Sequence, residues 1–283
     1  MRSTSVSCLQ KRFPAACIIL LAIEIPLAAA QTPAGQNAAA PAPAGKIDSA
    51  TIVAKMAEHN RMRDRTLHNY AAARVYKVEN KRVNKSAMVK TTMVFVQPDE
   101  KLFEVHSYSG MGFLRKGVLN RLIETERENS RGNLKAKIAM SAENYDFEHL
   151  RSETVNDRLQ YVVRAKARRK DKLLFNGTIW VDAEDFAVTR IEGRPAKNPS
   201  FWTRKVDFIQ EYKKQGPYWF PARNTSVTQV FIFGRTTTEI EHTNYQVNRP
   251  ELFEKAAEIR KRGEKLEVQI DAKDRQPPEK PQP

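Results

Sequence analysis

The feature that most constrains the fold is a long run of short strand-like segments in the second half of the chain. Each is rich in β-branched and aromatic residues, and turn residues such as Gln215-Gly216-Pro217 separate one segment from the next. The segments are Tyr145–Leu150, Leu159–Ala167, Leu173–Val181, Ala187–Glu192, Phe201–Tyr212, Tyr218–Phe220, Ser226–Phe233 and Thr236–Val247. No stretch long enough for a crossover helix lies between them, and parallel strands need such a connection. The run therefore predicts an antiparallel sheet.

Further strands are expected earlier in the chain, at Tyr70–Val78, Ala87–Val96 and Lys101–Tyr108. The turn residues Gln97-Pro98-Asp99-Glu100 separate the last two of these. About ten antiparallel strands in one series need a sandwich or a curled barrel to protect their edges. The sequence therefore predicts a mainly β (α+β) protein.

Helical patterns occur at three places. Asp48 or Ser49 can cap a helix that runs to about Thr66. A second helix is expected at Phe113–Glu128, where apolar residues recur at four-residue spacing and Glu126 and its charged neighbours face away from them. A charged helix is expected over residues 251–266.

Residues 1–30 have the composition of an export signal. Arg2, Lys11 and Arg12 give a basic start, the apolar run Cys17–Leu27 follows, and Ala28-Ala29-Ala30 offers a cleavage site. We expect cleavage at this point and export to the periplasm. Cleavage would also remove both cysteines of the chain.

The rest of the chain divides by composition. Residues 31–45 are rich in alanine and proline and carry no charge, which is typical of a flexible linker. Residues 46–249 are expected to form the folded domain. Residues 250–283 are expected to be a charged helix followed by a proline-rich tail.

Motifs that carry catalysis are missing from the sequence. The five histidines have no metal-binding spacing, and no nucleophile elbow, phosphate-binding loop or dinucleotide fingerprint occurs. Asp182, Glu184 and Asp185 lie close together, but such residues are also favoured in a hairpin turn. We therefore expect a protein that is not an enzyme, with no catalytic residue, no metal site and no cofactor.

The chain is strongly basic, with 48 Lys and Arg against 33 Asp and Glu and a formal net charge of +15. Arg168, Arg169 and Lys170 gather in one predicted turn. This turn has two interpretations: a solvated rim that discourages edge pairing, or a surface that docks onto an anionic membrane or an acidic partner. Nucleic acid would suit the charge, but an exported protein seldom meets it and no binding motif is present. We expect no nucleic-acid partner.

Several segments together resemble one known family. The clearest are Val94–Pro98, Phe175–Asp182, Ala187–Gly193 and Tyr218–Pro221. Through them the folded domain resembles the outer-membrane lipoprotein-sorting family, the periplasmic lipoprotein carriers and receptors (LolA/LolB-like). The resemblance implies a half-open antiparallel β-barrel of about eleven strands. It also implies lid helices over a cavity that holds the acyl chains of a lipoprotein or another lipid.

Strand alternation alone leaves open whether the interior is a filled core or a cavity. If it is a cavity, the helix Phe113–Glu128 would close over it as a movable lid. The residues expected at the cavity and lid are Phe103, Leu114, Val118, Leu122, Phe175, Ile179, Trp202, Val206 and Phe208. One departure from the family is Gln97, which stands where the carriers have an arginine that holds the lid closed.

Two functions follow from the resemblance. The first is that of an exported envelope protein that binds a lipid or lipoprotein acyl chains, as a carrier or sorting factor to the outer membrane. The second is that of a non-catalytic sensor or interaction module that binds an inner-membrane or outer-membrane envelope protein. Acyl chains that copurify with the protein would separate the two hypotheses.

Overall fold

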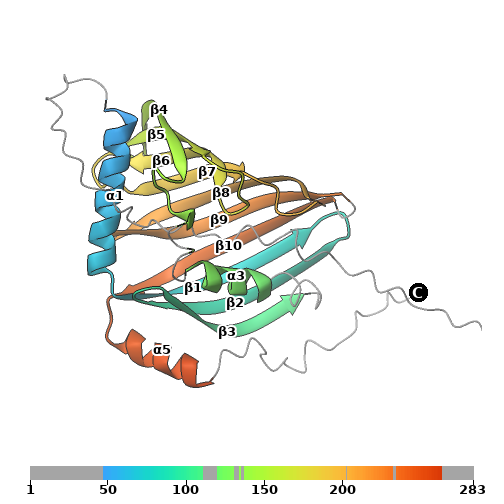
Figure 1. Cartoon of the computed structure of the whole chain (residues 1–283). Coiled ribbons are helices and arrows are strands. Elements are labelled where there is room, and N and C mark those ends of the chain that lie inside the picture. Colours follow the sequence, from blue (N-terminus) through green and yellow to red (C-terminus); the bar gives the residue numbers. More distant parts are fainter. Residues whose placement is uncertain are drawn as a thin grey trace, which may run out of the picture.

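The computed structural model describes residues 47–110, 120–130, 134, 137–201, 203–231 and 234–262. Figure 1 shows how their helices and strands are arranged. The helices are α1 (Ser49–Thr66), α3 (Asn120–Asn129) and α5 (Glu251–Arg262). The strands are β1 (Asn69–Asn80), β2 (Lys85–Val96), β3 (Glu100–Gly110), β4 (Tyr145–Val155), β5 (Arg158–Ala167), β6 (Phe175–Asp182), β7 (Val188–Pro195), β8 (Thr203–Gln215), β9 (Tyr218–Val230) and β10 (Gly234–Val247).

The ten strands form one sheet in the order β3-β2-β1-β10-β9-β8-β7-β6-β5-β4. Neighbours in the sheet are also neighbours in the chain, apart from β1 and β10, which pair in antiparallel register from Tyr70↔Val247 to Asn80↔Thr236. The predicted mainly β, antiparallel architecture is confirmed. The described residues contain ten of the roughly eleven strands expected.

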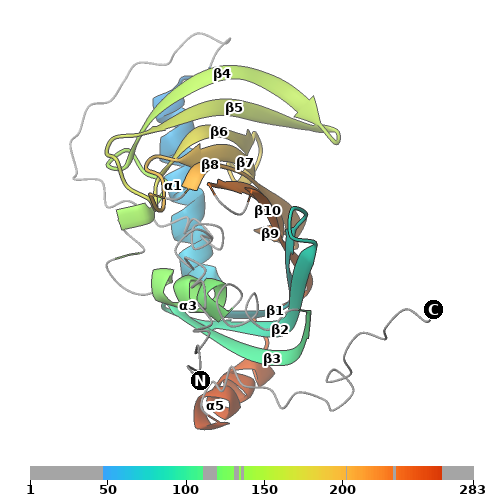
Figure 2. The same cartoon turned by 90° about the vertical axis from the view of Figure 1, so that its right-hand side faces the viewer.

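The sheet curves strongly, so that one face is concave and the other is an outer face (Figure 2). Helices α1 and α3 lie on the concave side, and α5 lies on the outer side of β1, β2 and β3. The edge strands β3 and β4 stand at opposite ends of the strand order. The sheet is therefore half-open, and helices rather than further strands cover its concave side.

One strand differs from the prediction. Residues 218–220 and 226–233 were expected as two strands, but β9 runs without a break from Tyr218 to Val230. Pro221 lies inside it, at a register irregularity where Tyr212 of β8 pairs with Pro221 and Glu211 pairs with Arg223. Proline has no N–H for the ladder and is tolerated in sheets at such bulges. The proline therefore bends the strand without ending it.

Helix α1 begins where the sequence predicts it. The Asp48 carboxylate accepts a hydrogen bond from the backbone N–H of Thr51 at 2.6 Å, which caps the first turn. Ile52, Met56 and Asn60 are buried at four-residue spacing. Because these positions share one side of the helix, α1 covers the concave face of β4, β5, β6 and β7.

Helix α5 packs on the opposite side of the molecule. Its Leu252, Ala256 and Ile259 form a small apolar cluster with Ala71, Val94, Val96 and Leu102 of the first three strands. Helix α5 is described as far as Arg262, and the expected extension to residue 266 lies outside the described residues. None of the helices in the described part has the length and apolar content needed to span a bilayer.

Candidate functional site on the concave face

The concave face carries two apolar clusters, one under each inner helix. The α3 cluster joins Leu122 and Ile123 of α3 to strand residues that include Tyr70, Tyr76, Val78, Val89, Met93, Phe103, Val206, Phe220 and Ile240. The α1 cluster joins Ile52 and Met56 of α1 to strand residues that include Tyr145, Val163, Phe175, Ile179, Val181, Val188 and Ile191. The helices therefore cover apolar surface that the open sheet would otherwise expose.

The structure brings most of the predicted cavity residues onto this face. Phe103, Leu122 and Val206 lie in the α3 cluster, Phe175 and Ile179 lie in the α1 cluster, and Phe208 packs against both. Apart from Phe208, each of these side chains is at most 4% exposed. Leu114, Val118 and Trp202 lie outside the described residues. The described part of the expected lid is helical from Asn120 to Asn129.

A polar stripe runs along β9 among the apolar residues of the concave face, and the sequence did not predict it. Asn224, Ser226 and Thr228 alternate along the concave face of β9 and are 7%, 1% and 1% exposed. Gln210 of β8 pairs in register with Asn224 and is 3% exposed. Within the described part of the chain, Asn224 Oδ1, Ser226 Oγ, Thr228 Oγ1 and Gln210 Nε2 have no hydrogen-bond partner. Buried polar atoms of this kind mark places where a polar ligand group or water fits.

A charged cluster, here called the Glu126 cluster, holds α3 to the sheet. The Glu126 carboxylate accepts hydrogen bonds from Arg74 Nη1, from Tyr76 OH at 3.0 Å and from Lys101 Nζ at 3.3 Å. These side chains are almost completely buried, with Arg74 1%, Lys101 7% and Glu126 2% exposed. Removing one partner from a buried ion pair costs about 3–5 kcal/mol. The cluster is therefore a strong attachment between α3 and the strands β1 and β3.

The burial of Glu126 corrects the prediction that it faces away from the apolar stripe of its helix. Glu126 follows Leu122 by four residues, so both lie on the same side of α3. The sequence also held a signal for Arg74. It occupies the same strand parity as Tyr70, Tyr76 and Val78, which are buried on the concave face. A charged residue at an apolar-parity position is a sign of a buried ion pair.

Further hydrogen bonds fix the two inner helices. Tyr108 OH of β3 donates to Asn120 Oδ1 at 2.9 Å, at the first residue of α3. Gln97 donates through Nε2 to the backbone carbonyl of Asp64 near the end of α1, and its Oε1 lies 3.2 Å from His68 Nδ1. The amide therefore links the β2–β3 turn to α1 at the position where the resemblance implies an arginine.

The predicted basic turn lies at one end of the β4–β5 edge. Arg168 Nε donates to Asp146 Oδ1 at 2.8 Å, and Arg169 Nη1 donates to Asn144 Oδ1 at 2.7 Å. Lys170 is exposed, like both arginines. The turn is therefore a solvent-facing basic patch whose arginines are held in place by side chains at the start of β4.

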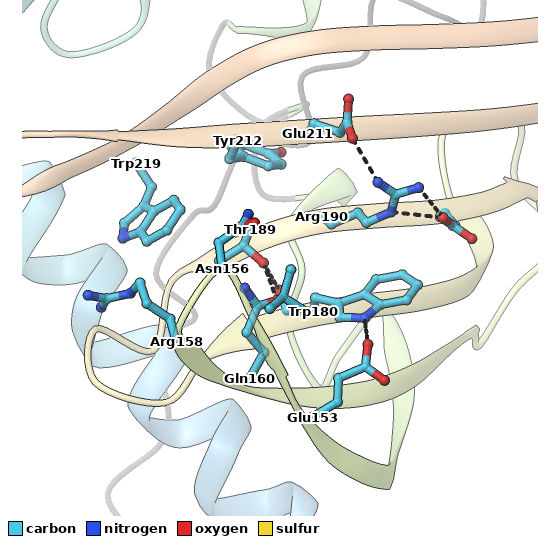
Figure 3. Close-up of a pocket in the computed structure, with 12 residues that line it drawn as sticks. Glu153, Asn156, Arg158, Gln160, Trp180, Thr189, Arg190, Glu211, Tyr212 and Trp219 are labelled. Atoms are coloured by element: carbon cyan, nitrogen blue, oxygen red, sulfur yellow. Dashed lines mark hydrogen bonds and ion pairs between the residues drawn. The ribbon is translucent and has the colours of Figure 1, made fainter.

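The outer face carries a separate pocket of about 460 Å³ (Figure 3). Trp180 of β6 follows Ile179 of the α1 cluster, and consecutive strand residues point to opposite faces, so Trp180 lies on the outer face. Tyr212, which also lines the pocket, packs against the α1 cluster as well. The β4–β5 turn forms one wall, where Asn156 and Asp157 have positive φ angles of 49° and 61°. Aromatic side chains of Trp180, Tyr212 and Trp219 line the rest.

The charges of this outer pocket pair with one another. Trp180 Nε1 donates to Glu153 Oε1 at 2.7 Å, and Arg190 bridges Glu192 at 2.5 Å and Glu211 at 2.7 Å (Figure 3). Its walls come from hydrogen-bonded strands, whereas helices cover the concave site. The outer pocket is therefore a preformed, half-exposed hollow.

The acidic group at residues 182–185 is a turn. Asp182 Oδ1 accepts hydrogen bonds from the backbone N–H groups of Glu184 and Asp185 at 3.1 and 2.8 Å, while Arg158 holds the same carboxylate with two bonds of 2.6 and 2.7 Å. Burial opposes ionisation of Asp182, but Arg158 and these amides outweigh it and lower its pKa. Within the described residues, no group of three or more His, Cys, Asp or Glu side chains could hold a metal ion.

No protein-family model matches the chain, and no curated protein matches its sequence. Solved structures do match. A domain described as an outer membrane lipoprotein-sorting protein domain from Vibrio parahaemolyticus is 13% identical with a TM-score of 0.37, over 73% of this chain and 97% of that chain. A LolA superfamily protein from Nitrosomonas europaea is 10% identical with a TM-score of 0.34, over 72% of this chain and 95% of that chain. The structure of the Pseudomonas aeruginosa MucA/MucB complex matches with 9% sequence identity and a TM-score of 0.24, over 70% of this chain and 95% of that chain.

Proposed function

We propose that this protein is an exported, non-catalytic envelope protein that binds lipid or lipoprotein acyl chains on the concave face of its sheet. It would act as a carrier or sorting factor to the outer membrane. The proposal rests on one observation: the concave face carries two large apolar clusters, and a separate helix, α1 or α3, covers each of them. A helix can leave an apolar surface without breaking the hydrogen-bond ladder of the sheet.

The mechanism is an exchange of apolar contacts. Helix α3 buries Leu122 and Ile123 against aromatic and aliphatic side chains of β1, β3 and β8. When α3 moves away, an acyl chain takes the place of these two side chains, and each buried CH₂ contributes about 0.8 kcal/mol. A short helix is marginally stable on its own, so most of the stability of α3 comes from the surface it covers. The acyl chain and the helix therefore compete for one site.

The outer pocket favours a second candidate, a sensor or interaction module that binds a partner protein. Its three aromatic side chains and paired charges resemble the composition of protein-binding surfaces, where aromatic residues and arginine are enriched. Helix α3 lies on the other face, and its cluster includes none of the residues that line this pocket, so the pocket can be occupied without moving α3. An envelope protein would be the partner.

Two measurements test the proposal. Protein purified from the periplasm should release acyl chains into organic solvent, detected by mass spectrometry, and its mature N-terminus should lie near Gln31. In addition, Val206→Trp should displace a fluorescent fatty acid with little loss of melting temperature, because the ring occupies space that the ligand uses. If the site were a filled core, overpacking would cost about 1–3 kcal/mol and the wild type would bind no probe.

The matched control is Val227→Trp. Val227 lies on β9, and β9 pairs with the strand of Val206, but the Val227 side chain has the opposite parity and points to the outer face. This variant should bind the probe as the wild type does. Equal loss of binding in both variants would show that the concave face is not the acyl site.

A further inference from the structure

The two cations of the Glu126 cluster lie on strands of the sheet, whereas its carboxylate lies on helix α3. Arg74 and Lys101 belong to β1 and β3, which are hydrogen-bonded within the sheet, and Glu126 belongs to α3. Any movement that removes α3 from the concave face therefore takes the carboxylate away and leaves both cations on the sheet.

Loss of that carboxylate would be costly, because the surroundings of the cations are apolar. The Arg74 guanidinium lies 5.8 Å from the centre of the Phe103 ring, and Phe103 belongs to the α3 cluster. A buried charge that loses its counter-ion is strongly destabilised. An apolar ligand alone would have to overcome this cost, whereas a ligand with its own acidic group would replace the lost contact. The concave face therefore favours an amphiphile that carries an anion.

The geometry of the cluster suits an oxyanion. Tyr76 OH and Lys101 Nζ point their donors at Glu126 together with the Arg74 guanidinium. A guanidinium recognises both carboxylate and phosphate, and charge-assisted bonds of this kind are stronger than neutral ones. The donors that now bind a glutamate side chain can therefore bind the acidic group of a ligand.

The polar stripe extends this site toward the centre of the sheet. Tyr76 pairs in register with Ile240, and Ile240 pairs with Asn224. Strands are about 4.8 Å apart, so Asn224 lies about 10 Å from Tyr76 across the concave face. Asn224, Ser226 and Thr228 present buried oxygen atoms that have no hydrogen-bond partner within the described residues. Hydroxyl or amide groups next to the acidic group of a ligand could donate to them.

We infer that the ligand of the concave face is an anionic amphiphile whose acidic group replaces the Glu126 carboxylate at Arg74, Tyr76 and Lys101. The inference rests on the proposed function, because it assumes that acyl chains enter the α3 cluster. Glu126 then acts as an internal substitute for the acidic group of the ligand. Binding of the ligand and release of α3 become one exchange reaction.

The experiment compares amphiphiles that have the same acyl or alkyl chain and carry either an acidic or a neutral head group. Displacement of a fluorescent fatty acid is measured with oleate against oleyl alcohol, and with lysophosphatidic acid against monoacylglycerol. Wild-type protein should bind each acid at least about tenfold more tightly than its neutral partner. The stronger of the two acids identifies the ligand group as a carboxylate or a phosphate. On binding, the amide protons of α3 should exchange faster.

Variants locate the effect. Arg74→Gln should remove most of the preference for the acid. Glu126→Gln should increase it, because the competing carboxylate is gone. Since Arg74→Gln could fail to fold, Lys101→Gln provides a second, milder loss of charge. The matched control is Lys77→Gln: Lys77 lies on β1 with opposite parity, pairs with Glu241 at 3.2 Å, and should leave the preference unchanged.

The outcomes separate the two proposals. Equal affinity for acid and neutral partner, in both the wild type and Glu126→Gln, would overturn the inference while acyl binding stands. Binding of neither class would overturn the proposed function and the inference with it. A preference for acids that Lys77→Gln removes as fully as Arg74→Gln would show that the anion binds outside the concave face.

Discussion

Arg74 and Arg190 make similar ion pairs on opposite faces of one sheet, in different surroundings. On the concave face, the Arg74 side chain is 0% exposed and that of Glu126 is 2% exposed. On the outer face, the side chains of Arg190 and Glu211 are 35% and 42% exposed. Exposed pairs contribute about 0–1 kcal/mol, whereas breaking a buried pair costs about 3–5 kcal/mol. The two pairs therefore differ in their contribution to stability because of burial more than because of geometry.

The pairs also connect different parts of the fold. Arg190 and Glu211 lie on β7 and β8 and are direct partners in register, so the ladder holds them together without the ion pair. Arg74 and Glu126 join the sheet to a separate helix. Of these two pairs, the inner one couples a charge to the position of a helix, whereas the outer one does not. The outer pocket, by contrast, is preformed.

The sharpest test of this comparison removes one arginine from each face. Arg74→Leu should lower the free energy of unfolding by about 3–5 kcal/mol, because Glu126 loses a charged partner in an apolar site. Arg190→Leu should lower it by at most about 1 kcal/mol. Urea unfolding of both variants measures the difference. Double-mutant cycles with Glu126 and Glu211 should give a large coupling energy for the inner pair only, and equal couplings would abolish the distinction.

The second test compares two helices. Leu122 of α3 and Leu252 of α5 are 0% and 3% exposed, so replacing either by alanine should cost about 2–5 kcal/mol. The consequences should differ, since α3 covers the concave face and α5 covers the outer face. Leu122→Ala should raise binding of a fluorescent fatty acid, and Leu252→Ala should leave it unchanged. Unchanged probe binding by Leu122→Ala would argue against α3 as a lid.

A third test uses Asp182, a buried carboxylate that binds Arg158 of the outer pocket and whose side chain is 1% exposed. Its pKa is lowered in the folded protein: burial opposes ionisation, but Arg158 and two backbone amides outweigh it. The ionised group therefore stabilises the fold above its ordinary pKa of about 3.9, and this contribution is lost as the pH falls through the lowered pKa.

Asp182→Asn should accordingly destabilise the protein at pH 7 and flatten the loss of stability between about pH 5 and pH 2. Urea unfolding at several pH values measures both effects. The expected loss of unfolding free energy exceeds that of Arg190→Leu, because burial, and not the face of the sheet, sets the strength of the Arg158–Asp182 ion pair. An unchanged acid profile would show that Asp182 contributes nothing to the pH dependence.

The strands were predictable because their signals are local. Turn residues and alternating apolar positions mark β1 to β8, and the cap at Asp48 marks the start of α1. The interruption at Pro221 misled the prediction, because a bulge that accommodates proline depends on the partner strand. The pairing of β1 with β10 joins segments far apart in the chain, and no local pattern specifies it.

The candidate site was predicted only in its apolar part. Phe103, Val206 and their neighbours follow strand parity, which the sequence displays. The Glu126 cluster depends on which helix lies against which strand, so Glu126 was predicted to face away from the apolar stripe of its helix. The polar stripe on β9 was missed because Ser226 and Thr228 are equally typical of an exposed strand face. Tertiary packing, and not local pattern, makes these residues functional candidates.

The smallest expected effect concerns the basic turn, which lies outside both regions compared. If Arg168, Arg169 and Lys170 dock onto anionic lipid, replacing all three by glutamine should weaken binding to vesicles that contain an anionic phospholipid. The loss should shrink as salt rises, because exposed charges are screened over about 8 Å at physiological ionic strength. The control replaces Lys81, Arg82 and Lys85 at the exposed β1–β2 turn, which changes the net charge equally. Equal weakening by both triple variants would leave only the overall basic charge of the protein, and no local surface, as the cause of membrane contact.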